Sequence, residues 1–259
     1  MVARSSTSVA GGWMAIIALK AWYLDGYEPI SEIVQRPHDL RLSRNSLLKS
    51  GLRADFLDDI EQVQQADWFQ RYLEGAEVEF YIEGSGGYAI ANIDLLSQEI
   101  YFTKQVINAV LDPVILLILD PDQDGSHWLD DAVQAYVDRH QARLRVPLRV
   151  EVLPRPPHGQ PLTLTPAHLR QIRNSLLLLV DVTPLPGQAL NGAVALELGY
   201  AIATKRPSQL LTLHLSPQSA QLPFELPKPQ QMQMRDRAEL DQTLHPWLDQ
   251  SLQRLNLFT

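Results

Sequence analysis

The sequence predicts an α/β protein in which a mostly parallel sheet, with helices on both faces, follows a small α+β domain. Two uninterrupted apolar runs, at 114–119 and 176–180, are typical of strands buried on both faces. Segments with helical spacing of apolar residues separate such runs, and alternating strands and helices form parallel sheets with right-handed crossovers. Before residue 113, helical and period-2 patterns follow each other over short distances, which indicates an antiparallel sheet with a few helices.

The length of 259 residues suits one large or two ordinary domains. We predict a frayed leader at 1–21, with Met14 as an alternative start, a small α+β domain at 22–110 and the α/β domain at 113–259. The chain has no cysteine, which excludes disulfides and a cysteine nucleophile and fits a reducing, cytoplasmic location. No apolar run approaches the ~18–20 residues that span a bilayer, so no membrane span is expected.

The chain is acidic, with a net charge of −8. Residues 1–112 hold 9 Lys and Arg against 16 Asp and Glu, a net of −7. Nucleic-acid binding needs a basic face that displaces counterions, so we expect no nucleic-acid partner. The basic stretch at 36–45 is interpreted as a solvated loop, with contact to an anionic ligand or partner as the alternative.

In the first domain, local patterns predict each element. Pro29 favours the start of a short helix, and Gly75 stands where a helical pattern over 56–72 should end. The glycines at 84–87 precede a strand pattern, so they predict a hairpin turn and not a phosphate-binding loop at a helix start. Strands are expected at 77–83, 88–95 and 98–102.

In the second domain, Thr165 is the expected N-cap of a helix whose first residue is Pro166. Pro246 is expected to interrupt the last helix or to divide it in two. The strands are expected at 114–120, 148–153, 176–183 and 208–216, and the helices at 126–141, 165–175, 191–204 and 237–255.

Polar side chains are expected at the carboxyl edge of the parallel sheet. Asp120 and Asp181 each end an apolar strand, Thr183 opens the next loop, and Asn191 is a good N-cap for the helix that follows. In open α/β sheets this edge borders the ligand crevice. All four residues are therefore candidates for substrate binding.

The helix that begins after Asn191 contains a single carboxylate, Glu197, and its only other ionisable side chain is Tyr200. Glu197 lies about 9 Å along the axis from the N-cap, so it can border a crevice ligand, and Tyr200 is a further substrate-binding candidate. Gly199 costs about 1 kcal/mol relative to alanine, which suggests close packing against the helix backbone. Alternatively, Glu197 is a solvated charge that flanks the predicted buried stripe of Val194, Leu198, Ala201 and Ile202.

These residues resemble a known pattern, which covers roughly residues 175–226. The stretch resembles TIR-like (Toll/interleukin-1 receptor-like) and related nucleotide-binding domains, which share a flavodoxin-like sheet with nucleoside 2-deoxyribosyltransferases. The resemblance implies a flavodoxin-like fold for the second domain. The matching positions are Asp181, Thr183, Asn191, Val194, Glu197, Leu198, Gly199, Ala201, Lys205, Leu222, Pro223 and Phe224.

The resemblance implies a hydrolase that cleaves the N-glycosidic bond of NAD or of a nucleoside or nucleotide. Glu197 would be the nucleophile or would stabilise the oxocarbenium-like state. Asp120 or Asp181 would orient the ribose or the base. NAD would be a substrate and no cofactor is expected. The first domain would sense a ligand or drive assembly, as a homo-oligomer or with a protein partner.

Two departures favour an alternative, a non-catalytic nucleotide-sensing or protein-interaction module in a larger complex. Gly192 and Ala193 replace the Pro-Asn of the pattern, and the loop after Asp120 is acidic and unlike a phosphate-binding turn. Asp120, Asp122 and Asp124 also resemble the opening of a calcium loop. Because a strand and not a helix precedes them, we expect a solvated turn and no metal.

Overall fold

The computed structural model describes residues 18–44, 46–47, 52–105, 107–120, 126–155, 162–185, 187–215 and 231–259. The chain forms an N-terminal unit of residues 1–25 and 30–107 and a C-terminal unit of residues 26–29 and 108–259. Residues 1–17 of the expected leader lie outside the described residues, and β1 begins at Ala18, within the expected leader.

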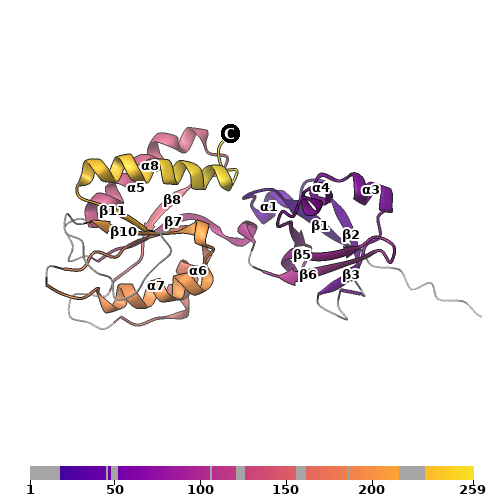
Figure 1. Cartoon of the computed structure of the whole chain (residues 1–259), viewed down its shortest axis with the longest axis horizontal. Coiled ribbons are helices and arrows are strands. Elements are labelled where there is room, and N and C mark those ends of the chain that lie inside the picture. Colours follow the sequence, from indigo (N-terminus) through magenta and orange to yellow (C-terminus); the bar gives the residue numbers. More distant parts are fainter. Residues whose placement is uncertain are drawn as a thin grey trace, which may run out of the picture. The chain divides into compact units, whose positions relative to one another are not determined.

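The N-terminal unit is built on one antiparallel sheet of six strands in the order β2-β1-β4-β5-β6-β3 (Figure 1). Leu42 forms a bridge to Phe56, just beyond β3, so the two edge strands approach each other and the sheet is nearly closed, like a barrel. The strands are β1 (Ala18–Leu24), β2 (Leu40–Ser43), β3 (Arg53–Asp55), β4 (Glu79–Ile82), β5 (Gly86–Asp94) and β6 (Glu99–Lys104).

Local patterns in this unit predicted the short helix after Pro29, the helix end at Gly75 and the central hairpin. The helical pattern over 56–72 was too long, because Phe56 forms a strand bridge and two helices are separated at Ala66. Gly75 follows α4 with a φ of +80°, and Gly84 and Gly86 have φ values of +69° and +103° in the turn between β4 and β5. Only glycine adopts such angles at little cost. The helices are α1 (Ile30–Ile33), α3 (Ile60–Gln65) and α4 (Asp67–Leu73). Trp68 packs edge-on against Phe80 in the core, at 5.2 Å between ring centroids.

The C-terminal unit contains a parallel sheet of five strands in the order β11-β10-β9-β7-β8. The strands are β7 (Asp112–Ile118), β8 (Arg149–Val152), β9 (Ser175–Asp181), β10 (Leu210–Leu215) and β11 (Gln231–Met234). The helices are α5 (Ser126–His140), α6 (Pro166–Asn174), α7 (Gly192–Thr204) and α8 (Arg237–Arg254), with short 3-10 turns at Asn108–Val110, Gln141–Arg143 and Pro207–Gln209.

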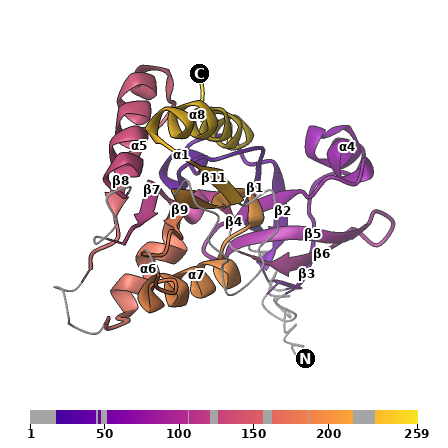
Figure 2. The ribbon, with the colours of Figure 1, turned by 60° about the vertical axis from the view of Figure 1, so that its left-hand side comes forward.

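Alternate residues of the central strands face two apolar layers. Leu117 and Leu179 pack in one layer with residues of α5 and α8. Leu116 and Leu178 pack in the other layer with residues of α6 and α7. Figures 1 and 2 show α5 and α8 on one face of the sheet and α6 and α7 on the other. The strands are buried on both faces, as their uninterrupted apolar sequences predict.

The predicted fold class, a flavodoxin-like sheet preceded by a small α+β domain, is wrong. The N-terminal unit is a nearly closed six-stranded sheet and not a three-stranded one. In the C-terminal unit the flavodoxin-like arrangement is seen only in part: helices cover both faces of the parallel sheet, but no helix among the described residues lies between β10 and β11. The sequence of β11, Gln-Met-Gln-Met, alternates polar and apolar residues over only four positions, and this fifth strand was not predicted.

The last helix, α8, continues through Pro246, so the predicted interruption is wrong. Leu240, Leu244, Leu248 and Leu252 recur every fourth residue and are fully buried. Burial of this stripe against the sheet offsets the backbone hydrogen bond that a proline removes. None of the helices in the described ranges is long and apolar enough to cross a membrane.

Candidate functional site

The site is located by the order of the strands. From β7 the chain moves outward to β8, then returns to β9 beside β7 and continues to β10 and β11. The order therefore reverses between β7 and β9, and ligands of open α/β sheets bind beyond the carboxyl ends of the strands at such a point. Asp181 is the last residue of β9, and Asp120 follows the end of β7 by two residues.

Asp120 and Asn191 meet at this point. The Asn191 side-chain amide donates to Oδ2 of Asp120 at 3.0 Å, and its oxygen accepts from the backbone N–H of Ala193 at 2.9 Å. Asn191 is thus the predicted N-cap of α7. The Asp120 side chain is almost fully buried, with 3% of the residue exposed. The hydrogen bond ties the end of β7 to the first turn of α7.

Asp181 and Thr183 form a second pair. The backbone N–H and the hydroxyl of Thr183 both donate to Oδ1 of Asp181, at 3.0 and 2.5 Å. The Thr183 hydroxyl also accepts from the N–H of Leu215 at 2.7 Å, which joins the ends of β9 and β10. Asp181 is in register with Leu213, a residue of the layer under α5 and α8. The two pairs therefore share one edge of the sheet but face opposite layers.

Glu197 is fully buried between α7 and α6. Its Oε1 atom lies 2.8 Å from Nε2 of His168, and its Oε2 atom lies 2.6 Å from a terminal guanidinium nitrogen of Arg155. Arg155 follows β8, and its Nε donates to the carbonyl of Leu119, just past β7, at 3.1 Å. His168 lies in the first turn of α6, after its N-cap Thr165. Glu197 thus connects two helices to the ends of two strands.

This arrangement decides between the two interpretations of Glu197. None of the residue is exposed, so a solvated surface charge is wrong. A carboxylate loses several kcal/mol of hydration on burial, and ion pairing and hydrogen bonding to Arg155 and His168 offset that loss. Oε1 is hydrogen-bonded to His168, whereas Oε2 forms an ion pair with Arg155 that lacks hydrogen-bond geometry, and because the residue is fully buried a ligand can reach neither oxygen while Arg155 holds this position.

Two further expectations about α7 are wrong. Gly199 is exposed, and a Cβ atom added there would meet nothing within 4 Å, so no part of the described chain packs closely against it. Ile202 is 47% exposed and does not belong to the buried stripe, which consists of Val194, Glu197, Leu198 and Ala201. Tyr200 is half-buried against the layer under α6 and α7, about one turn further from the carboxyl edge than Glu197.

Sequence reasoning missed three residues of this region: Arg155, His168 and His214. Arg155 lies in a proline-rich segment that predicts only a loop. His168 and Glu197 are 29 positions apart, so no local pattern links them. The signal that could have singled out His168 is its place three residues after a strong N-cap, which puts it at the carboxyl edge of the sheet. His214 lies near the end of β10 and is 8% exposed.

The residues of the calcium-like stretch are only partly described. Asp122 and Asp124 lie outside the described residues, as do Leu222, Pro223 and Phe224 of the TIR-like pattern. Within the described ranges, no three histidine, aspartate or glutamate side chains are grouped so as to hold a metal ion. Asp131, eleven residues after Asp120 and so at the twelfth position of a calcium loop that begins there, lies 3.6 Å from Arg237 on the surface.

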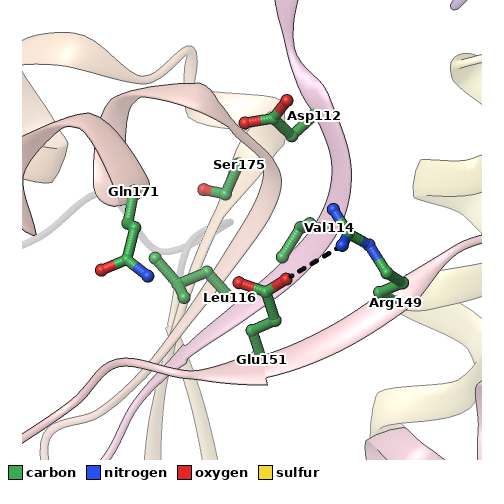
Figure 3. Close-up of a pocket in the computed structure, with 7 residues that line it drawn as sticks. All are labelled: Asp112, Val114, Leu116, Arg149, Glu151, Gln171 and Ser175. Carbon is green, nitrogen blue, oxygen red and sulfur yellow. Dashed lines mark ion pairs between the residues drawn. The ribbon is translucent and has the colours of Figure 1, made fainter. Parts of the chain in front are cut away.

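A cavity of about 50 Å³ lies at the opposite, amino-terminal end of the parallel sheet (Figure 3). Asp112, at the start of β7, and Glu151, on the edge strand β8, face it together with Gln171 and Ser175. Lys205 lies nearby, where its amine donates to the carbonyls of Arg173 and Ser175 at the end of α6. Burial lowers the pKa of Lys205 to about 7, and the Asp112 carboxylate opposes this shift.

Lys205 should make the stability of the C-terminal unit depend on pH. The unfolded chain binds this proton up to about pH 10.4, whereas the folded chain loses it near pH 7. Stability rises with pH wherever the unfolded state binds more protons. We expect the unfolding free energy of the wild type to rise between pH 7 and pH 10 relative to Lys205→Met. Lys20→Met, at an exposed position, is the matched control, and a pH-independent difference for Lys205→Met would contradict the expectation.

The described geometry thus brings together Asp120 with Asn191, Asp181 with Thr183, and Glu197 with two residues that no pattern predicted. Comparisons with protein-family models, curated proteins and solved structures find no match for this chain.

Proposed function

We propose that the C-terminal unit binds a nucleoside or a nucleotide at the carboxyl edge of its parallel sheet, and that it does not cleave this ligand in the arrangement described above. The observation that carries the proposal is the hydrogen bond between Asp120 and Asn191. It places a strand-end carboxylate beside a helix N-terminus where the strand order reverses, which is the usual ligand position in open α/β sheets.

The chemistry of this edge suits both parts of a nucleotide. A carboxylate such as Asp120 accepts hydrogen bonds from ribose hydroxyls. The N-termini of α6 and α7 both lie at this edge, and backbone N–H groups there favour an anion such as phosphate. Arg155 adds a guanidinium cation near the end of β7. The TIR-like pattern at 175–226 supports the same ligand class.

The burial and the contacts of the Glu197 carboxylate favour ligand binding over ligand cleavage. A nucleophile must place one carboxylate oxygen against the glycosidic carbon. In Glu197 one oxygen is held by His168 and the other by Arg155, and the residue is fully buried. We therefore assign Glu197 a positioning role, in which it holds Arg155 and the first turn of α6 at the ligand edge.

The proposal is tested by measuring the affinity of NAD, adenosine and other nucleosides by calorimetry. Asp120→Asn should weaken binding about tenfold or more, because a hydrogen bond to a charged acceptor contributes about 1.5–3 kcal/mol. Asp112→Asn is the matched control, since Asp112 lies at the other end of β7 and is exposed. Equal affinities for the two variants would refute binding at this edge.

Cleavage of the N-glycosidic bond is the second candidate function. The observation that favours it is that His168 and Arg155 fix the orientation of the Glu197 carboxylate, as preorganised electrostatic catalysis requires. Cleavage would require Arg155 to leave Glu197 when the ligand binds. Release of free nicotinamide or free base by the wild type, absent in a folded Glu197→Gln variant, would decide for this candidate.

A further inference from the structure

His214 is a buried histidine at the same edge of the sheet. It precedes Leu215, the last residue of β10, and only 8% of it is exposed. Its neighbours Leu213 and Leu215 face the layer under α5 and α8. Because side chains alternate along a strand, His214 faces the opposite layer, under α6 and α7. The Asp120–Asn191 pair lies on that side too, two strands away.

The imidazole of His214 has unused hydrogen-bonding capacity. Its Nε2 atom is buried and has no hydrogen-bond partner within the described part of the chain. A buried polar atom without a partner costs about 1–3 kcal/mol, and such atoms are few in native proteins. Within the described residues, Nε1 of Trp68 in the N-terminal core and Nη1 of Arg155 at this same edge also lack a hydrogen-bond partner. By contrast, two buried polar side chains at the other end of β10 have hydrogen-bond partners: Lys205, which follows α7, and Gln209, which directly precedes β10.

The surroundings of His214 favour an uncharged partner. Burial lowers the pKa of His214 below its ordinary value of 6.5, and the Asp181 carboxylate opposes this shift. The ring is therefore neutral at pH 7. A neutral ring has no positive charge to pair with a phosphate group, and the field of the Asp181 carboxylate, which faces the other layer, repels a phosphate. A base or a sugar hydroxyl meets no such repulsion.

We infer that Nε2 of His214 hydrogen-bonds an uncharged group, on the base or the sugar, of the nucleoside or nucleotide bound at this edge. The inference rests on the proposed function and adds a residue that selects for the nucleoside part of the ligand. Asp120 follows the end of β7 and His214 lies on β10, with β9 between these two strands, so the strands are about 10 Å apart. A nucleoside that bridges them contacts both residues at once.

The test compares His214→Leu and His214→Gln with the wild type, using adenosine and NAD as probes. His214→Leu should weaken both ligands by the same factor, about tenfold, which corresponds to 1.4 kcal/mol. His214→Gln, whose amide can replace Nε2, should recover part of the affinity. His38→Leu, at an exposed position in the N-terminal unit, is the matched control. His214→Leu should fold as well as the wild type, because it removes a buried polar atom that lacks a partner.

Each contrary outcome has a separate meaning. If the wild type binds and His214→Leu binds equally well, the inference is wrong and the proposed function stands. A larger loss for NAD than for adenosine would indicate a phosphate contact and would also overturn it. Equal losses in the leucine and glutamine variants would indicate a role in shape and not in hydrogen bonding. If the wild type binds neither probe, the proposed function fails, and the inference fails with it.

Discussion

Replacing Glu197 with glutamine should lower the free energy of unfolding of the C-terminal unit by about 3–5 kcal/mol, the cost of breaking a buried ion pair by removing one partner. The variant leaves the guanidinium of Arg155, whose side chain is 13% exposed, without its counter-charge. It also changes the acceptor of His168. Urea unfolding, with the midpoint and slope compared with the wild type, measures the effect.

Glu151→Gln is the matched control for this prediction. Glu151 lies on the edge strand β8, 3.7 Å from Arg149, and both side chains are partly exposed. Exposed ion pairs contribute about 0–1 kcal/mol, so this variant should unfold close to the wild type. If Glu197→Gln is as stable as Glu151→Gln, the buried ion pair does not hold the site together, and a positioning role for Glu197 is wrong.

Replacing Tyr27 with alanine should destabilise the C-terminal unit by about 3–5 kcal/mol, as for other buried aromatic residues. Tyr27 belongs to the segment 26–29, which is part of the C-terminal unit although it precedes most of the N-terminal unit in sequence. Its ring is buried in the layer under α5 and α8, and its hydroxyl donates to the carbonyl of Leu111 at 3.0 Å. Faster amide hydrogen exchange in β7 and β9 would report the loss.

Two companion variants separate the causes of this effect. Tyr27→Phe removes only the hydrogen bond to Leu111 and should cost about 0.5–1.5 kcal/mol. Tyr101→Ala, on the N-terminal sheet and 37% exposed, should leave exchange in β7 and β9 unchanged. An unchanged C-terminal unit in Tyr27→Ala would mean that the segment 26–29 is not part of its core. A fragment that begins at residue 108 would then be as stable as the full chain.

The sequence predicted those elements whose signal is local. The apolar runs of β7 and β9, the Thr165 and Asn191 caps and the hairpin glycines each specify their own structure within a few residues. The short strands β2, β3 and β11 give only a weak local signal, because the alternation in β2 and β11 covers four residues and β3 has three residues. Their stability depends on pairing with other strands, so such a short pattern does not identify them by itself.

The site was predicted in part for the same reason. Asp120, Asp181 and Asn191 were predicted to share one edge of the sheet, because they stand at strand ends and at a helix cap. This prediction uses only the rule that ligands bind beyond the carboxyl ends of parallel strands, so it needs no tertiary information. In the structure, the alternation of side chains between the two faces of the sheet places Asp120 and Asp181 on opposite faces. Predicting this requires the register of the strands, which the sequence does not give. The two partners of Glu197, His168 and Arg155, come from two other segments of the chain, so its burial followed from tertiary packing and not from the pattern of α7.

The stability prediction also affects how an activity assay on Glu197 is interpreted. A Glu197→Gln sample that lacks activity could contain unfolded protein as well as protein without a nucleophile. The folded fraction must therefore be measured in the same buffer, and a ligand that binds only the folded state will stabilise the variant. Only a folded variant that binds the ligand without releasing base would identify Glu197 as catalytic.

The measurement that tests the central claim most directly is calorimetric titration of the wild type with NAD and adenosine, followed by chromatography of the recovered ligand. We predict saturable binding, weakened in Asp120→Asn but not in Asp112→Asn, with the ligand recovered intact. Binding that is absent, or equal in the two variants, would contradict a nucleoside or nucleotide site at the ends of β7 and β9. Recovery of free base would show that the protein cleaves the ligand, and a folded Glu197→Gln variant would then test whether Glu197 is the catalytic group.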